Sequence, residues 1–107
     1  MPEFHTIELS IKNDIAQLTL NRPDSANAMN TQMAEEMLVV LTGPEAPAAA
    51  ARCIVLTGTG GRAFCAGGDL NWMKSMSQYT EELNVEDALK LSNMLRDLNA
   101  LPCPTIA

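Results

Sequence analysis

The sequence has 107 residues, a length that limits it to one domain or to part of one. Its formal net charge of −6 argues against nucleic acid or an anionic membrane surface as a partner, because little on this chain could neutralise phosphates over an extended face. Three widely spaced cysteines and a single histidine exclude the usual zinc patterns, so we expect no metal. No apolar run reaches the length of a membrane span, and the N-terminus lacks a secretory signal, so we expect a cytoplasmic setting.

Two segments near the N-terminus alternate between apolar and polar residues. In residues 6–12 ("TIELSIK") apolar side chains fall at every second position, and residues 15–21 ("IAQLTLN") repeat the pattern. The polar residues 12–14 between them are typical of a turn. Alternation on both sides of a short turn predicts an antiparallel hairpin, in which one face of the first strand consists of Ile7, Leu9 and Ile11.

A polar loop and an amphipathic helix follow the hairpin. Residues 22–30 combine Pro, Asp, Ser and Asn, a composition typical of a loop. Asn30 is a good N-cap for a helix that begins at Thr31 and that Gly43 and Pro44 should end. The spacing of its apolar residues predicts a buried face of Met33, Met37, Val40 and Leu41.

Two further strands are expected. The apolar run Cys53 to Thr57 predicts a strand that is buried on both faces, as in a sheet covered by helices. Because a helix separates it from the hairpin, we expect a right-handed crossover and parallel pairing. The last residues, 105–107, look like the start of another buried strand, which indicates the front part of a longer protein.

Two helices are expected between these strands. The first spans residues 69–76, with Leu70, Met73 and Met76 on one side. The second runs from residue 81 to about 100, with Thr80 as its N-cap and prolines after its end. Its predicted buried stripe is Val85, Ala88, Leu91, Leu95 and Leu98, and Glu86 is expected to pair with Lys90 on the outside. The acids expected on solvated helix faces are Glu35, Glu36, Glu81, Glu82, Glu86 and Asp87.

The segment from Gly58 to Met73, "GTGGRAFCAGGDLNWM", has five glycines in its first eleven residues. A structural role in turns is one interpretation. Residues 58–63 also match the dinucleotide pattern G-x-G-x-x-(G/A), but Gly67 and Gly68 interrupt the helix that this pattern requires. A third interpretation uses a backbone N–H where the glycines meet the helix near Asp69. Such a donor can stabilise negative charge that develops on a carbonyl oxygen, and so form half of an oxyanion hole.

Three blocks together, "LTLNRPDSANAMN", "IVLTGTGGRAFCAGGDL" and "PTIA", resemble the N-terminal half of the enoyl-CoA hydratase/isomerase (crotonase) superfamily. The stretch "GGDLNWMKSM" is similar, more faintly, to hydratases of the methylglutaconyl-CoA type. The resemblance implies an α/β fold that is a spiral of ββα turns, of which residues 1–107 are an N-terminal part. It also implies a homotrimer or hexamer, an acyl-CoA thioester as substrate, and no cofactor besides the coenzyme A of that substrate.

The resemblance further implies roles for individual residues. The N–H of Gly68, where the family more often has alanine, is an oxyanion-hole donor to the thioester carbonyl. Ala66, beside Gly67, contacts the adenine through its carbonyl. The residues that line the acyl-thioester end are Asp69, Leu70 and Asn71, and those that border the pantetheine and nucleotide are Arg22, Ser25, Ala26 and Ala28. The second donor and the catalytic glutamates lie downstream of the "PTIA" strand in the family.

The implied reaction is reversible addition of water to a 2-enoyl-CoA thioester. The alternatives are an isomerase, a dehalogenase or another reaction that shares the same enolate, and a non-catalytic fragment that binds CoA thioesters. Among the remaining residues, Cys65 is expected to fill space in the loop, since a nucleophilic thiol would need a nearby base. Trp72 is expected to be a core or interface anchor, and His5 to face solvent.

Overall fold

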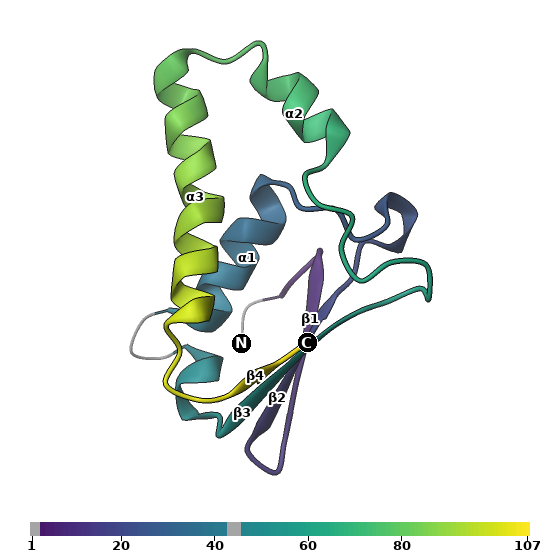
Figure 1. Ribbon diagram of the computed structural model, residues 1–107, viewed down its shortest axis with the longest axis vertical. Coiled ribbons are helices and arrows are strands. Elements are labelled where there is room, and N and C mark those ends of the chain that lie inside the picture. The colour runs from purple at the N-terminus through teal and green to yellow at the C-terminus, as the bar shows by residue number, and fades with distance from the viewer. Residues whose placement is uncertain (1–2, 43–45) are drawn as a thin grey trace.

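A computed structural model describes residues 3–42 and 46–107, in which four strands form one sheet in the order β1-β2-β3-β4 (Figure 1). β1 (Ile7–Lys12) and β2 (Ile15–Leu20) pair antiparallel. Asn13 and Asp14, between them, both have positive φ (54° and 65°), as the two-residue turn of a tight hairpin requires. The predicted hairpin is therefore confirmed.

Parallel pairing extends the sheet beyond the hairpin. β3 (Cys53–Gly58) runs alongside β2, and β4 (Thr105–Ile106) runs alongside β3. Parallel neighbours need a crossover connection, and a helix between β2 and β3 supplies it, so the predicted parallel arrangement is confirmed. The expected burial of the last strand is wrong, because both of its residues are exposed at the edge of the sheet.

The crossover helix α1 (Thr31–Leu41) begins where its cap predicts. The Oδ1 of Asn30 accepts a hydrogen bond from the N–H of Met33 at 2.9 Å, which satisfies one of the free amides of the first turn. The helix ends at Leu41, and the predicted stop residues, Gly43 and Pro44, lie outside the described part of the chain. All four residues of the predicted stripe are buried: Met33, Met37, Val40 and Leu41.

The hydrophobic core lies where α1 and the short 3-10 turn η2 (Pro47–Ala50) meet the sheet. Along β3 the core side is buried at Ile54 and Leu56, whereas Val55 and Thr57 are only half-buried. The prediction that this strand is buried on both faces is therefore wrong in this chain, because the helices pack against one face of the sheet. The fully buried side chains at the centre include Ile7, Leu18, Leu20, Met33, Met37, Ile54 and Met94.

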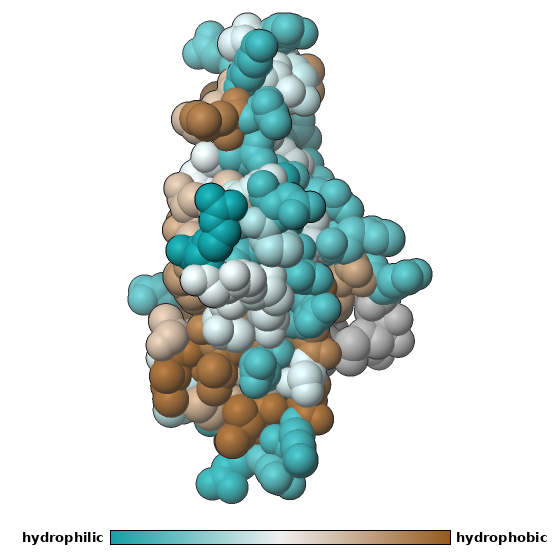
Figure 2. Space-filling view, turned by 90° about the vertical axis from the view of Figure 1, so that its right-hand side faces the viewer, coloured by the Kyte–Doolittle hydropathy of each residue, from teal (hydrophilic) through white to brown (hydrophobic). Residues whose placement is uncertain are grey.

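Apolar residues also reach the surface at the sheet end of the molecule. Figure 2 shows them gathered over the lower part of the face that it draws. Ile11 and Ile15, which flank the hairpin turn, are 48% and 45% exposed. The helices therefore leave the hairpin end of the sheet uncovered.

Within residues 3–42 and 46–107, no helix combines the length and the apolar character that crossing a bilayer demands.

The long helix α3 (Glu81–Asn99) packs along α1, as Figure 1 shows. The Oγ1 of Thr80 accepts a hydrogen bond from the N–H of Leu83 at 3.2 Å, so the predicted cap is confirmed. The predicted stripe is wrong at three positions, which are exposed: Val85, Ala88 and Leu95. The inward face instead consists of Asp87, Leu91, Met94 and Leu98. Because α3 carries apolar residues on two neighbouring stripes, its contact with α1 decided which stripe is buried.

Lys90 pairs with the neighbouring helix and not, as expected, with Glu86 of its own. Its Nζ lies 2.7 Å from Oε1 of Glu35 on α1, and this hydrogen bond raises the pKa of Lys90. Both side chains are substantially exposed, so the pair contributes at most about 1 kcal/mol to stability.

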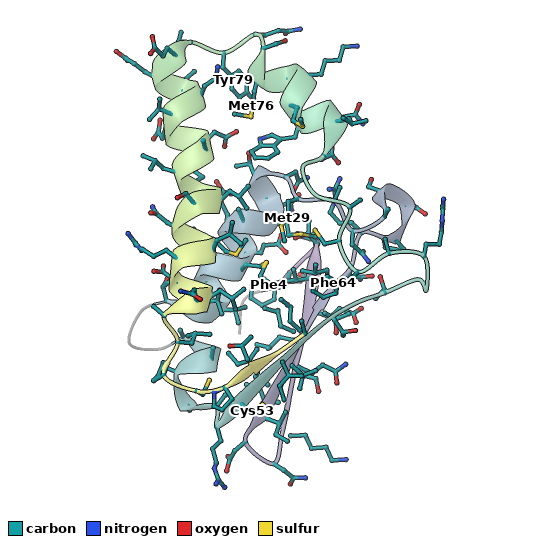
Figure 3. All side chains as sticks on the ribbon, in the orientation of Figure 1. Phe4, Met29, Cys53, Phe64, Met76 and Tyr79 are labelled. Atoms are coloured by element: carbon teal, nitrogen blue, oxygen red, sulfur yellow. The ribbon has the colours of Figure 1, made fainter. Side chains whose placement is uncertain are left out.

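The short helix α2 (Leu70–Met76) follows the glycine segment and stands apart from the sheet, beside the N-terminal half of α3 (Figure 1). None of its residues is buried, and Leu70 and Met73 are 79% and 50% exposed. The predicted helix is confirmed, but the predicted apolar side does not enter the core. Figure 3 shows Met76 and Tyr79 between the upper ends of α2 and α3.

Candidate active site

The loop after β2 and the glycine segment after β3 lie side by side, although about forty residues separate them in sequence. The loop contains one 3-10 turn, η1 (Pro23–Ser25). The N–H of Ala66 donates to the carbonyl of Ala26 at 3.1 Å, and the N–H of Met29 donates to the carbonyl of Gly67 at 2.7 Å. These backbone bonds bring together two groups of residues that the sequence analysis assigned to the same ligand.

Asn27 is the residue that joins these two segments, and the sequence analysis did not single it out. Its side chain is fully buried and satisfies three backbone groups. Its Oδ1 accepts from the N–H of Arg22 at 2.8 Å, and its Nδ2 donates to the carbonyls of Thr59 and Ala63 at 2.9 and 3.0 Å. Its own φ is 57°, a conformation that asparagine tolerates better than most residues. The sequence feature that could have indicated this role was an asparagine within a short polar loop.

Gly58 gives Asn27 the space it needs. A Cβ at Gly58 would lie 2.6 Å from the carbonyl oxygen of Phe64 and 2.8 Å from Nδ2 of Asn27. Real Cβ atoms do not approach other atoms this closely, so a larger residue would displace the loop. The structural interpretation of the glycines is therefore correct at this position.

The amide of Gly68 has no hydrogen-bond partner within residues 3–42 and 46–107. Met29 forms a parallel bridge with Gly68 by accepting from the N–H of Asp69 at 2.7 Å and donating to Gly67. In such a bridge the central residue directs its own N–H and C=O to the opposite side. Gly67, with a φ of +93°, makes the turn that leads into this geometry. The N–H of Gly68 is therefore directed away from Met29.

An open hollow of about 390 Å³ is lined in part by Gly68. Its walls come from the loop after β2, from the end of the glycine segment and from the first turn of α2. Its lining residues are Ser25, Ala28, Ala66, Gly68, Asp69, Leu70 and Asn71. Three further residues assigned to the ligand, Arg22, Ala26 and Gly67, are outside this lining.

Among the described residues, no group of three or more His, Cys, Asp or Glu side chains could hold a metal ion.

Arg22 is bonded inside the protein. Its guanidinium donates through Nη1 to the carbonyl of Ala28 and through Nη2 to Oδ2 of Asp69, at 2.8 Å in the second case. The side chains of Arg22 and Asp69 are only 19% and 8% exposed. The ion pair therefore links the loop after β2 to the N-cap of α2, which is the residue that follows Gly68.

Asp69 is the N-cap of α2. Its Oδ1 accepts from the N–H of Trp72 at 3.0 Å, while Oδ2 holds Arg22. The hydrogen bond from Trp72 and that from Arg22 together lower the pKa of the Asp69 carboxyl. The carboxylate thus stays ionised at neutral pH and fixes the chain immediately after Gly68.

Two acids expected on solvated faces bind residues of other segments instead. Glu36 on α1 accepts, through Oε1, from the N–H groups of His5 and Thr6 and from the hydroxyl of Thr6, each at 2.9 Å. Asp87 on α3 is 8% exposed and bonds to two other helices. The prediction that both carboxylates face solvent was wrong because their partners lie 15 to 56 residues away in sequence.

Cys65, by contrast, matches its expected role. It is half-buried and packs against the hydrophobic core cluster. His5 is exposed, as expected.

The chain is similar to known proteins of one family. The sequence profile of the family described as enoyl-CoA hydratase/isomerase matches residues 10–107. The Bacillus subtilis protein YngF, provisionally named an enoyl-CoA hydratase/isomerase, is 37% identical over 103 residues, which are 95% of this chain and 38% of YngF. The short-chain-enoyl-CoA hydratase of Clostridium acetobutylicum is 33% identical over 75 residues, which are 70% of this chain and 28% of that protein.

The fold is shared as well. The crystal structure of an enoyl-CoA hydratase from Shewanella pealeana superimposes with a TM-score of 0.83 at 30% identity, over 96% of this chain and 38% of that one. The chain thus spans about 38% of the length of YngF and of the Shewanella enzyme. The sequence match and the shared architecture lead to one conclusion: the chain belongs to the enoyl-CoA hydratase/isomerase, or crotonase, family.

Proposed function

We propose that the protein containing this chain is an enoyl-CoA hydratase. It adds water reversibly to the 2,3 double bond of a 2-enoyl-CoA thioester. As water adds, negative charge develops on the thioester oxygen, and backbone N–H groups stabilise the resulting enolate. The N–H of Gly68 is one of these donors. The family description and the names of the relatives support the reaction class.

The observation that carries the proposal is the amide of Gly68. It has no partner among the described residues, and Gly68 borders a hollow of about 390 Å³. An oxyanion donor must be free before the substrate arrives and must be held in place while charge develops. The bridge to Met29 holds the segment on one side, and the Arg22–Asp69 pair holds it on the other. One such preorganised donor contributes about 3 kcal/mol to transition-state stabilisation.

The hollow and the two segments beside it are the proposed site for parts of the coenzyme A and acyl groups. Ser25 and Ala28 of the loop after β2 and Ala66 of the glycine segment line the hollow, and Ala26 and Gly67 lie next to them in the chain. We assign these five residues to the pantetheine and nucleotide, and Leu70 and Asn71 to the acyl-thioester end. Arg22 supports the site through Asp69, since its guanidinium is already bonded within the protein. The acid and base that move the proton are assigned to no residue of this sequence.

The test removes the Gly68 N–H in the full-length protein and measures hydration of crotonyl-CoA. Gly68→Pro, or an amide-to-ester replacement at residue 68 that removes the N–H alone, should lower kcat about 100- to 1,000-fold. Gly68→Ala keeps the N–H; its Cβ would lie 3.3 Å from Sδ of Met73, a flexible side chain that can move, so activity should stay within a few-fold of wild type. Cys65→Ala should be nearly silent.

A wild-type rate in the ester variant would overturn the role of Gly68. Complete loss of activity in Cys65→Ala with an intact fold would favour a thiol mechanism instead.

A second candidate is an enoyl-CoA isomerase that uses the same enolate, because the family description includes both activities. Product analysis separates the two: a hydratase forms a 3-hydroxyacyl-CoA from crotonyl-CoA, whereas an isomerase shifts the double bond of a 3-enoyl-CoA and adds no water. Binding of a CoA thioester with neither reaction would indicate a non-catalytic binding protein.

A further inference from the structure

The short helix α2 holds one end of the candidate site, yet it has little packing of its own. It begins two residues after Gly68, spans Leu70–Met76, and contains no buried residue. A seven-residue helix without a buried face is not stable by itself. Its position must therefore come from a few specific contacts. Two of them are the Arg22–Asp69 pair at its N-cap and a hydrogen bond from the indole of Trp72.

Trp72 connects α2 to α3 through a buried carboxylate. Its indole Nε1 donates to Oδ2 of Asp87 at 2.7 Å, and the other oxygen, Oδ1, accepts from the hydroxyl of Thr31 at 2.7 Å. Asp87 is 8% exposed. A single carboxylate on α3 thus bonds to α2 and to the first residue of α1.

Both hydrogen bonds to this carboxylate come from neutral donors. Burial of a charge is costly. Three features offset that cost: the two short hydrogen bonds, the favourable charge interaction with Lys90 on the same helix, and the position beside the N-terminus of α1, where the free amides of the helix favour an anion. Loss of Asp87 would leave the indole N–H and the Thr31 hydroxyl without partners.

Trp72 is also linked to the residue that follows Gly68. Its backbone N–H donates to Oδ1 of Asp69 at 3.0 Å, and its ring lies near Gly68, since a Cβ added there would be 4.0 Å from Cζ3. The same residue is therefore bonded to Asp69 through its main chain and to α3 through its indole N–H. A shift of Trp72 would reach the backbone at residue 68 through Asp69.

We propose that Asp87 is a positioning residue that acts through Trp72 to fix the orientation of the Gly68 amide. The inference rests on the function proposed above for Gly68, but the contacts that carry it are independent of that function. Asp87 and Trp72 do not take part in the chemistry; they keep α2 and the loop before it in one arrangement.

The first test compares Trp72→Phe with Thr6→Val in the full-length protein. Trp72→Phe removes the indole N–H and keeps an aromatic ring at this position and the backbone N–H that bonds to Asp69. Thr6→Val removes a side-chain hydrogen bond of similar length, to Glu36 in the middle of α1. Trp72→Phe should lower kcat for crotonyl-CoA about 10- to 100-fold with KM within about threefold, because only the placement of the oxyanion donor changes. Thr6→Val should leave kcat within twofold.

A comparison of two Asp87 variants distinguishes a positioning role of this side chain from an effect of its charge. Asp87→Ala should reproduce the defect. Asp87→Asn should restore most of the activity, since the amide oxygen can accept from Trp72 and the amide N–H₂ can donate to Thr31. Equal losses in Asp87→Asn and Asp87→Ala would overturn the inference.

The second test needs no activity. Hydrogen–deuterium exchange of the segment 66–76 should be about 10- to 100-fold faster in Trp72→Phe than in wild type, the range expected for loss of a hydrogen bond to a charged group, while exchange in β1 and β2 stays unchanged. Exchange within twofold of wild type in this segment would overturn the inference. A wild-type protein that lacks hydratase activity would overturn the proposed function, and the exchange result would still decide the role of Asp87.

Discussion

The Arg22–Asp69 ion pair is expected to be a strong contribution to the stability of the site, and a double-mutant cycle measures it directly. Arg22→Met keeps the aliphatic stem and removes the guanidinium. Asp69→Asn removes the charge and keeps a good N-cap, because the amide oxygen can still accept from the N–H of Trp72. The two variants and their combination isolate the energy of the pair from the energy of the cap.

The structure sets the expected magnitude. Nη2 and Oδ2 are 2.8 Å apart, and the two side chains are 19% and 8% exposed. A hydrogen bond between charged groups contributes about 1.5–3 kcal/mol when buried, and the partial exposure of Arg22 reduces this to a coupling energy of about 1.5 kcal/mol. With a urea m-value of about 1.5 kcal/mol/M, that coupling corresponds to about 1 M in the unfolding midpoint.

The assay is urea unfolding followed by circular dichroism, with all four proteins under the same conditions. The expected result is that the double variant is about 1.5 kcal/mol more stable than the sum of the single effects would predict. If the single effects add to within about 0.4 kcal/mol, the pair behaves as an ordinary surface ion pair, and the argument that it holds the Gly68 segment is wrong.

Three further predictions concern pH, Asn27 and Gly58. The pKa of Asp69 is lowered by the N–H of Trp72 and by Arg22. The contribution of this carboxylate to stability is therefore present above about pH 4 and is lost as the pH falls further. Between about pH 6 and about pH 3, the urea midpoint of Asp69→Asn should fall less than that of wild type. Asn27→Ala leaves three backbone groups without their partner and should lower the free energy of unfolding by about 3 kcal/mol in the same urea assay, whereas a loss below about 1 kcal/mol would show that water replaces the side chain. Gly58→Ala places a Cβ 2.6 Å from the carbonyl oxygen of Phe64 and should cost about 2 kcal/mol, with Gly68→Ala as a control that should cost under about 1 kcal/mol; equal effects would contradict the steric argument.

The local elements were predictable because their signals are local. Alternation at period two defined the hairpin, and the side chains of Asn30 and Thr80 cap the helices at the positions their spacing predicts. The buried stripe of α1 also followed from its period, since Met33, Met37, Val40 and Leu41 fall on one face. Of the site, the sequence supplied the residues that line the hollow, because they lie in two short blocks that resemble one family.

The buried face of α3 could not be read from its sequence. Two neighbouring stripes of this helix are apolar, and burial of either would satisfy its period. The face that contains Met94 is buried because it meets α1, a choice made by the packing of two helices whose contact residues are far apart in sequence.

The sequence by itself determined the order of strands and helices, the caps, and the family. Only the tertiary structure decided which polar groups meet: Asp87 with Trp72 and Thr31, Lys90 with Glu35, and Asn27 with the backbone of the glycine segment. The physical reason is that a helix or a turn is stabilised by neighbours within about four residues, whereas a buried polar side chain takes whichever partner the packed core brings within about 3 Å.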